Sequence, residues 1–370
     1  MSCALVESRR PHLHPMMSTP LLTIAVPTYN RAPSLRRSLA AIIRQIDSIP
    51  QAWDRIELLV SDNCSTDDTP VVIASFAQTS PLKATRSTEN IGMDGNFIAL
   101  FKRATGRHLW LISDDDLLVD NALEKVLALL EQESPDLVYL KARFLFGELD
   151  SFPTETQDFD FLEVSGDMFT LRSNSTLSFL SSVISHRERY LHMTAGGEPD
   201  RFRGSYLPHF EWVFTLLARG GRFFISSQAP VLARTGATGG YSLYEVFCDN
   251  LTAICRDRLK DVPRRRRLLE DAHLFIHLPG FVMRSRENSF GKFQFSPEDA
   301  ARHIANSFGH GLFFRMFMRP MLFGSDRLAL LAFKCSRVYA LYWSATRRVL
   351  LLLGGHRPRV VTPRPLVEPR

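Results

Sequence analysis

The chain has 370 residues, of which 45% are hydrophobic and 23% charged, a composition typical of a globular protein with two domains, or with one large domain plus extensions. The formal net charge is +6, but residues 256–370 hold 22 Lys and Arg against 9 Asp and Glu, so this segment carries +13 and the remainder −7. A basic segment joined to an acidic body indicates either an anionic partner or simply a solvated surface.

Both ends of the chain are expected to lie outside the folded core. Residues 1–19 contain charges and no apolar stretch, so they are predicted to be a flexible extension and not a signal peptide. The chain holds no run of about 18 apolar residues, which predicts no transmembrane helix. Its five scattered cysteines show no zinc-site spacing and suit a reducing, cytoplasmic compartment.

The first part of the chain alternates strand and helix patterns. Short apolar runs predict strands at residues 21–26, 56–61, 83–87, 108–113 and 136–140. Between them, 3.6-residue periodicity predicts helices at residues 34–46, 69–77, 95–104 and 121–133. This alternation predicts an α/β fold with a doubly wound, mostly parallel sheet and helices on both faces.

The pattern changes after about residue 145. Residues 146–204 are irregular and rich in Ser, Thr and acids, with a possible strand at 177–185. A short helix is expected at 210–218 and a loosely alternating strand at 223–233. The chain then has a helical pattern from residue 244 to 353. The last 16 residues hold four prolines and four arginines, and 355–370 is predicted to be disordered.

Aromatic, polar and acidic residues that could bind a ligand follow three of the predicted strands. The first strand ends in Pro27-Thr28-Tyr29-Asn30-Arg31, the second in Ser61-Asp62-Asn63, and the fourth in Ser113-Asp114-Asp115-Asp116. Ligands of open parallel sheets bind outside the carboxyl ends of the strands, so these segments should surround one crevice. A Tyr ring can stack on a nucleobase, and adjacent carboxylates repel one another unless a cation lies between them. Hard oxygen ligands of this kind suit Mg²⁺ or Mn²⁺.

These motifs resemble the glycosyltransferase family 2 catalytic domain, which has the fold called GT-A. The resemblance covers about the first 140 residues and includes the segment Glu89-Asn90-Ile91-Gly92. The motif Ser61-Asp62-Asn63, together with the three acids Asp114-Asp115-Asp116, resembles the branch of the family that includes abequosyltransferases and related O-antigen sugar transferases. It implies a nucleotide-sugar-binding half at residues 20–145 and an acceptor-binding half at 146–245. Residues 246–354 are expected to form a helical region, either membrane-associated or packed on the catalytic domain.

The resemblance also implies roles for individual residues. The donor, a nucleotide-diphosphate sugar, would be bound by ten residues of this half: Pro27, Thr28, Tyr29, Asn30, Arg31, Asp62, Asn63, Asn90, Gly92 and Asp114. Asp115 is the expected catalytic metal ligand, with Asp116 as a second ligand, for Mg²⁺ or Mn²⁺. Most members of the family have an acidic residue at the position of Ser113 and often have Asp at the position of Asn63. The choice of metal ligands among Asp114, Asp115 and Asp116 therefore stays open.

Inverting members of this family use a carboxylate base on the acceptor side. It commonly lies about a dozen residues before a Gly that closes a helix, and counting back from Gly220-Gly221 gives Pro208-His209. His209 lies at the expected distance before the glycines, and Glu211 has the carboxylate that the family uses as a base. Asp200 and Glu198 are further candidates for the base. The acceptor would be a saccharide or a lipid-linked saccharide in O-antigen-like polysaccharide synthesis.

The C-terminal region interleaves apolar and basic residues. Residues 308–353 place Phe and Leu among Arg at helical spacing, which suits a helix lying on an anionic membrane surface. The alternative is a set of helices packed on the catalytic domain with their arginines outward. Residues 264–267, four consecutive arginines, could add to the basic surface or form a solvated helix face. The expected location is the cytoplasmic membrane, as a peripheral protein on its inner face.

Other classes of protein fit less well. A nucleic-acid partner is not expected, because the sequence contains no known nucleic-acid-binding motif and the predicted catalytic edge of the sheet is acidic. A dinucleotide oxidoreductase would need GxGxxG after the first strand, where this chain has Pro27 to Arg31. A nucleotidyltransferase of similar fold would need a Gly-rich loop with Arg or Lys there. A non-catalytic, membrane-associated scaffold that binds nucleotide sugars remains an alternative if the chain has no base.

Overall fold

The computed structural model describes residues 19–146, 154–234, 241–287, 295–364 and 366. Its centre is a nine-stranded sheet with the order β12-β8-β10-β6-β9-β4-β1-β2-β3. The strands are β1 (Leu22–Thr28), β2 (Ile56–Asp62), β3 (Lys83–Arg86), β4 (His108–Leu111), β6 (Leu137–Tyr139), β8 (Phe161–Val164), β9 (Val183–Ser185), β10 (Phe223–Ser226) and β12 (Arg359–Val361). The extension predicted at residues 1–19 lies almost wholly outside the described residues.

The predicted mostly parallel sheet is confirmed. Strand β1 pairs in parallel with both β2 and β4, β2 with β3, and β10 with β6. Strand β9 is antiparallel to β4 and β6, and β8 is antiparallel to β10 and β12. Only β8 and β9 therefore run against the other seven strands. The carboxyl ends of β1, β2 and β4 lie at the same edge, because these three strands are parallel neighbours.

Both faces of the sheet are covered by helices, as the apolar strands require. Along β1, Ile24 and Val26 belong to one core cluster and Ala25 to the other, so the strand is buried on both sides. One face carries α1 (Ala32–Asp47), α3 (Thr69–Ala77) and α5 (Ala122–Glu133), and the other carries α4 (Gly92–Arg103) and α8 (Phe210–Arg219). The 3- and 4-residue spacing of the buried side chains of α1, which include Leu35, Leu39 and Ile42, turns them toward this sheet.

The segment 223–233 differs from its prediction as one strand. It forms β10 and a separate strand β11 (Val231–Arg234), which lies in a second, three-stranded sheet with β5 (Leu117–Leu118) and β7 (Ala142–Leu145). The break falls at Gln228, whose carbonyl accepts a hydrogen bond of 2.7 Å from the Ser226 hydroxyl. Pro230 then has no N–H to continue a sheet ladder. The chain therefore leaves the large sheet after β10.

The predicted strand at 177–185 is only partly correct. Residues 183–185 form β9, whereas Asn174–Ser178 and Leu180–Ser182 are short 3₁₀ turns. The remaining elements before residue 245 are three helices: α2 (Ala52–Arg55), α6 (Gly166–Ser173) and α7 (Arg187–Met193).

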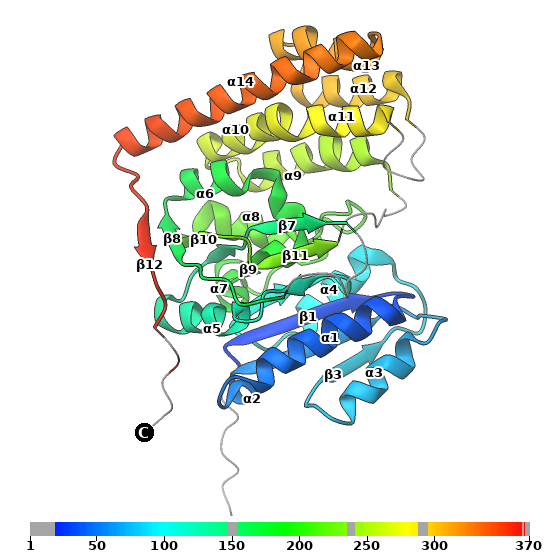
Figure 1. Cartoon of the computed structure of the whole chain (residues 1–370), viewed down its shortest axis with the longest axis vertical. Coiled ribbons are helices and arrows are strands. Elements are labelled where there is room, and N and C mark those ends of the chain that lie inside the picture. Colours follow the sequence, from blue (N-terminus) through cyan, green and yellow to red (C-terminus); the bar gives the residue numbers. More distant parts are fainter. Residues whose placement is uncertain (1–18, 147–153, 235–240, 288–294, 365, 367–370) are drawn as a thin grey trace, which may run out of the picture.

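The predicted helical C-terminal region is confirmed. It contains α9 (Leu251–Arg258), α10 (Pro263–Ala272), α11 (Leu278–Arg286), α12 (Pro297–Phe308), α13 (Arg319–Phe323) and α14 (Asp326–Leu353), with π-helical segments η4 (Glu245–Asn250), η5 (His273–His277) and η6 (Phe314–Met318). Figure 1 shows these helices stacked at one end of the molecule, far from α1 and α3, with the long α14 running across it. Among the described helices, none combines the length and the apolar character needed to cross a bilayer.

The prediction of disorder over residues 355–370 is wrong where β12 forms. This strand pairs with the edge strand β8, and the side chain of Val361 is buried in the core. Arg359 Nε donates to Glu163 at 2.7 Å, and its Nη2 lies 3.1 Å from Glu133 Oε2. Composition suggested disorder because prolines flank the strand, but pairing with an unoccupied sheet edge outweighs that local preference. Residues 365 and 367–370 lie outside the described residues.

Candidate active site

The three polar strand ends meet at one edge of the sheet. The register pairs Thr28 of β1 with Asp62 of β2, and the Asn63 amide donates to the Thr28 carbonyl at 3.0 Å. After β4, the Ile112 amide donates to the Ala25 carbonyl at 3.0 Å, which carries Ser113–Asp116 to the end of β1. The parallel pairing of neighbouring strands therefore brings together segments that are far apart in the sequence.

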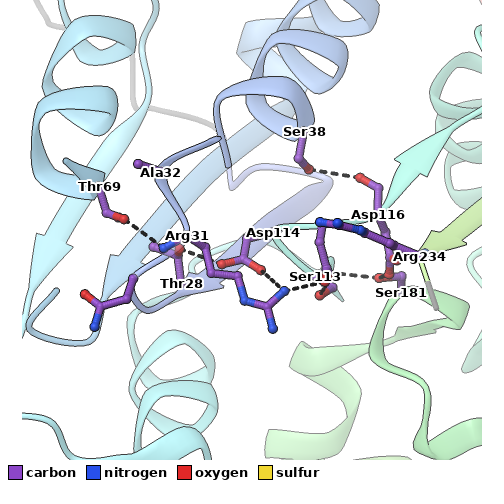
Figure 2. Close-up of polar contacts among 12 residues, drawn as sticks. Thr28, Arg31, Ala32, Ser38, Thr69, Ser113, Asp114, Asp116, Ser181 and Arg234 are labelled. Atoms are coloured by element: carbon purple, nitrogen blue, oxygen red, sulfur yellow. Dashed lines mark hydrogen bonds and ion pairs between the residues drawn. The ribbon is translucent and has the colours of Figure 1, made fainter. Parts of the chain in front are cut away.

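Asp114 and Asp115 are buried carboxylates beside the same arginine, Arg31, and Figure 2 shows Asp114 next to it. The Thr28 hydroxyl donates to Asp114 Oδ2 at 2.6 Å, and the Ser113 hydroxyl donates to Asp115 Oδ1 at 2.6 Å. Arg31 Nη1 forms an ion pair with Asp115 and lies 3.9 Å from Asp114 Oδ1. The Arg31 side chain is 35% exposed, whereas both acids are buried. The guanidinium group thus lies between the acids and solvent.

Burial disfavours the ionised forms of two acids in the acidic loop. Burial raises the pKa of Asp114 to about 7, although the positive charge of Arg31 acts in the opposite direction. Burial, together with the negative charge of Asp115, raises the pKa of Asp116 to about 8. Three successive carboxylates beside a single guanidinium group make this edge a favourable place for a further cation.

Asp116 has a different environment from the other two acids. Its Oδ2 accepts from the Ser181 hydroxyl at 2.6 Å, and its Oδ1 accepts from the Arg234 amide at 3.1 Å. Its backbone carbonyl accepts from the Ser38 hydroxyl at 3.1 Å. Both carboxylate oxygens are therefore engaged inside the protein, which does not suit the metal-ligand role predicted for Asp116. Ser181 and Arg234 cannot be predicted as partners of the acidic loop, because nothing local in the sequence links them to it.

The loop after β1 is held against the loop after β2. Asn30 has a left-handed backbone (φ 52°), its amide donates to Ser65 Oγ at 2.8 Å, and its side-chain Oδ1 accepts from the Thr66 amide at 2.7 Å. The Arg31 amide donates to Thr69 Oγ1 at 3.1 Å. These bonds fix the backbone on both sides of Arg31, while the Tyr29 ring remains 42% exposed. Tyr29 is thus an accessible aromatic surface beside the acidic loop.

Asp62 and Asn63 organise the second strand end. Asp62 is buried, accepts from the Ser65 amide at 2.9 Å, and lies 3.2 Å from Arg86 Nε. The Asn63 side-chain amide donates to Asn90 Oδ1 at 2.8 Å, and its Oδ1 accepts from the Ile91 amide at 3.0 Å. An Asp at position 63 could accept but, when ionised, could not donate. This double role explains why Asn replaces the common family Asp here.

The Asn90–Gly92 turn lies directly against this strand end. The Gly92 carbonyl accepts a further bond from the Asn63 amide at 3.2 Å, and the Gly92 amide donates to Asn90 Oδ1 at 2.9 Å. Gly92 has φ +77°, a left-handed backbone conformation that residues other than glycine rarely adopt. The structure thus brings Asn90 and Gly92 to Asn63.

The two favoured base candidates lie inside the protein. His209 is 3% exposed, its Nε2 lies 3.2 Å from the Leu177 carbonyl, and burial lowers its pKa to about 4. Glu211 is 1% exposed, accepts from Tyr190 at 3.0 Å, and pairs with Arg258 at 2.5 Å. Neither stands open to an acceptor, because the start of α8 is packed inside the core. The predicted base role of His209 and Glu211 therefore does not fit their positions.

The other two base candidates are surface acids held by cations. Asp200 pairs with Lys102 and with Arg203, the latter at 2.8 Å. Glu198 has a side chain 73% exposed and pairs with Arg201 at 3.3 Å. Across the described ranges, no cluster of three or more His, Cys, Asp or Glu side chains is arranged to hold a metal by itself. A cation at this edge would need further ligands from a bound molecule.

Comparison with known proteins agrees with this architecture. The family model described as "Glycosyl transferase family 2" matches residues 23–189. The abequosyltransferase RfbV of Salmonella typhimurium is 26% identical over 186 residues, which cover 46% of this chain and 54% of that protein. A glucosyltransferase of Escherichia coli, WfgD, is 25% identical and covers 32% of this chain and 44% of its own length. This chain thus spans about half the length of these curated relatives, or less.

A solved structure shows the same fold over most of the chain. The Staphylococcus aureus protein TarS, residues 1–349 in complex with UDP, superposes with a TM-score of 0.56 over 85% of this chain and 89% of that one, at 14% sequence identity. TarS is a poly(ribitol-phosphate) beta-N-acetylglucosaminyltransferase, 26% identical to this chain over 127 residues. Residues 23–189 thus match the glycosyl transferase family 2 model, and the chain has a GT-A-type fold like that of TarS.

Proposed function

We propose that the protein is a glycosyltransferase that moves a sugar from a nucleotide-diphosphate sugar onto a saccharide or lipid-linked acceptor. The product would be part of a cell-surface polysaccharide of the O-antigen type. The observation that carries this proposal is the buried pair Asp114 and Asp115 with Arg31, at the meeting point of β1, β2 and β4. The family match, the abequosyltransferase RfbV and the poly(ribitol-phosphate) beta-N-acetylglucosaminyltransferase TarS support the same class of reaction.

The donor would bind along this edge. The exposed Tyr29 ring can stack on a nucleobase, and Asp62 can accept from a base N–H or a ribose hydroxyl. The turn Asn90–Gly92, fixed by Asn63, would lie beneath the sugar diphosphate. Arg31 reaches the acids from the solvent side, so its guanidinium group can also contact the diphosphate.

The carboxylates fit a hard divalent cation. We propose that Asp115 binds Mg²⁺ or Mn²⁺, with Asp114 beside it and the remaining ligands supplied by the donor diphosphate. Such an ion would neutralise the charge on the departing diphosphate. The hydrogen bonds of Thr28 and Ser113 hold the two carboxylates in place for this role. Asp116 would act as a positioning residue, because its oxygens join the acidic loop to Ser181 and Arg234.

We propose an inverting displacement, in which the acceptor hydroxyl attacks the sugar directly while a base takes its proton. His209 and Glu211 are left out of that role here because both are enclosed by the core. A lipid-linked acceptor would place the reaction at a membrane, and we propose the cytoplasmic membrane surface as the place of action.

Ligand-induced stabilisation tests the donor and metal site. UDP, GDP, CDP and dTDP are added to the full chain with and without Mn²⁺, and the unfolding temperature is recorded. One nucleoside diphosphate should raise it with Mn²⁺, since a ligand at 100 times its Kd adds about 2.7 kcal/mol to the unfolding free energy. Asp115→Asn should lose the Mn²⁺-dependent part of this shift. The control Asp120→Asn, an acid paired with Arg44 at 2.6 Å beyond the site, should keep it.

Donor turnover gives the second readout. The wild-type protein should hydrolyse or transfer the sugar of the donor whose nucleotide it binds, and Asp115→Asn should lower that rate by at least 100-fold. The proposal fails if no nucleoside diphosphate shifts the unfolding temperature. It also fails if Asp115→Asn and Asp120→Asn behave alike in both measurements.

A further inference from the structure

Helix α14 carries apolar side chains on two opposite sides. Its inner side is packed on the helical region through buried residues that include Ala332, Ala340 and Trp343. Its outer face, defined here as Leu331, Val338, Leu341, Tyr342 and Val349, is solvent-exposed, with exposed fractions of 58%, 68%, 66%, 73% and 53%. The spacing of 7, 3, 1 and 7 residues places these five side chains on one side of an α-helix. They lie opposite the buried residues.

An outer face of this kind is unusual for a helix on the surface of a protein. The solvent side of such a helix is normally polar, and large exposed apolar patches mark sites of interaction. In Figure 1, α14 runs along the outside of the helical end of the molecule, with α13 beside it at one end. At 1.5 Å per residue, its 28 residues span about 42 Å. The outer face is therefore a long apolar strip that no described residue covers.

Three basic side chains, Arg327, Lys334 and Arg348, lie on or beside the same strip. Of the other two basic residues of α14, Arg347 follows the buried Ala340 by seven residues, and Arg337 donates to the Ile276 carbonyl at 3.3 Å. The one acid of the helix, Asp326, is paired with Arg286 at 2.7 Å. Within the described ranges, Arg327, Lys334 and Arg348 form no ion pair, so their charge is free to meet an external anion. An apolar strip bordered by unneutralised cations is complementary to a surface that is apolar inside and anionic outside.

The segment before α14 continues this character. Leu312 is 73% exposed, Met316 54% and Phe323 50%, and exposed Arg315 and Arg319 lie between them. This segment packs against α14 through the aromatic contact of Phe313 with Tyr339, whose ring centroids are 5.3 Å apart. The exposed apolar side chains thus extend beyond one helix.

We propose that the outer face of α14 binds the surface of an anionic lipid bilayer, with the helix lying in the plane of the membrane. The five basic residues of α14 prevent it from crossing the bilayer core, and Arg327, Lys334 and Arg348 suit the headgroup region. A second protein as occupant would have to supply acids to match Arg327, Lys334 and Arg348. An anionic membrane supplies apolar and anionic contacts along the whole helix. The sugar-transfer site lies elsewhere on the molecule, so this inference stands apart from the donor chemistry.

Vesicle sedimentation of the full chain tests the proposal. Vesicles of phosphatidylcholine alone are compared with vesicles containing 30 mol% phosphatidylglycerol, at about 0.05 M and 0.5 M NaCl. Wild-type protein should sediment with the anionic vesicles at low salt and at least tenfold less with the neutral ones. The double variant Val338→Glu with Leu341→Glu should lower binding to anionic vesicles at least tenfold. Lys334→Gln with Arg348→Gln should lower it several-fold and reduce its salt dependence.

Matched controls separate lipid binding from folding and from donor binding. Val71→Glu changes a 65% exposed apolar residue on α3, at the other end of the molecule, and should leave sedimentation unchanged. All variants should keep the wild-type unfolding temperature and its shift with nucleoside diphosphate, so loss of lipid binding would be distinct from failure of the donor site. The proposal is overturned if wild type does not sediment with anionic vesicles, or if the Val338/Leu341 variant sediments like wild type. It is equally overturned if light scattering shows a dimer that this variant disrupts while lipid binding is absent.

Discussion

At the scale of single residues, the sheet edge proposed to bind the donor is held together by side chains that both donate and accept hydrogen bonds. Asn63 is the clearest case, since its amide group reaches Asn90 and Gly92 while its carbonyl oxygen receives the Ile91 amide. Asn121 plays the same double role away from the site, because it donates to the Gln157 carbonyl and accepts from the Gln157 amide. The two residues allow stability and donor binding to be separated.

We expect Asn63→Asp to weaken both folding and donor binding. The substitution removes a donor and places a negative charge beside Asn90 Oδ1, which should lower the unfolding free energy by about 1–3 kcal/mol in urea denaturation. It should also reduce the unfolding-temperature shift with nucleoside diphosphate. Asn121→Asp should reduce stability by a comparable amount and leave the ligand shift intact. Equal ligand shifts in both variants would argue against a donor-site role for Asn63.

Glu211 gives a second prediction at this scale. Glu211→Gln leaves Arg258 without its main carboxylate partner inside the protein, and removing one member of a buried ion pair costs about 3 kcal/mol. The variant should therefore lose stability by this amount in urea denaturation, whereas Glu198→Gln, at a 73% exposed side chain, should lose under about 1 kcal/mol. A Glu211→Gln protein with unchanged stability and no sugar transfer would instead identify Glu211 as the base.

At the scale of elements, β12 ties the end of the helical region to the catalytic sheet. The chain leaves α14, passes along the edge of the sheet, and pairs with β8. Arg359 contacts Glu133 of α5 and Glu163 of β8, so one side chain joins a helix and a strand. Without β12, β8 would present unpaired backbone groups at an exposed edge, a common starting point for aggregation.

Truncation tests this role of β12. A chain that ends at residue 355 loses the strand and should unfold at a lower temperature and aggregate faster, because β8 becomes an open edge and the buried side chain of Val361 is lost. A chain that ends at residue 366 keeps β12 and the hydrogen bonds between Gln132 and Arg364, and should match the full chain. Thermal unfolding and light scattering measure both effects. Equal behaviour of the two truncations would show that β12 contributes nothing.

At the scale of the whole molecule, one core joins the catalytic domain to the helical region. The same cluster holds Phe101 of α4 and Trp212 of α8, whose rings stack at 4.4 Å, together with Phe275 and Trp343 of the C-terminal helices. The boundary predicted at residue 246 therefore does not mark the edge of a separate core. It remains a prediction about function rather than about folding.

A shared core predicts that the chain unfolds in one transition. Phe275→Ala, in the helical region, should lower the unfolding free energy by about 3 kcal/mol and shift the transition of the whole chain, since Phe275 packs on Phe313, Tyr339 and Trp343. Phe323→Ala, at a 50% exposed ring, should shift it much less. Differential scanning calorimetry measures the transition. Two resolved transitions, with only one moved by Phe275→Ala, would contradict a common core.

The sequence by itself determined the longer strands and helices of residues 20–140, without the short α2 and β5, and the loops that follow β1, β2 and β4. The helix over 69–77 and the strands beginning at 56 and 108 were predicted within two residues, because apolar periodicity is a local property of the chain. Because alternating strands and helices predict parallel strands, and parallel strands end at the same edge of a sheet, the polar strand ends could be placed at one edge without knowledge of any contact. The same reasoning explains why Thr28, Asp62 and Asp114 could be assigned to one site in advance.

Only the tertiary structure decided which side chains of that site remain open. Asp115 faces Arg31, whereas its neighbour Asp116 turns to Ser181 and Arg234, and His209 and Glu211 are enclosed although the family pattern points to this position in the chain. The division of residues 223–233 between two sheets and the pairing of β12 with β8 are of the same kind. Each depends on partners more than 30 residues away or on the sheet edge that happens to be free. Local periodicity carries no information about such contacts, since burial and pairing are properties of the folded chain.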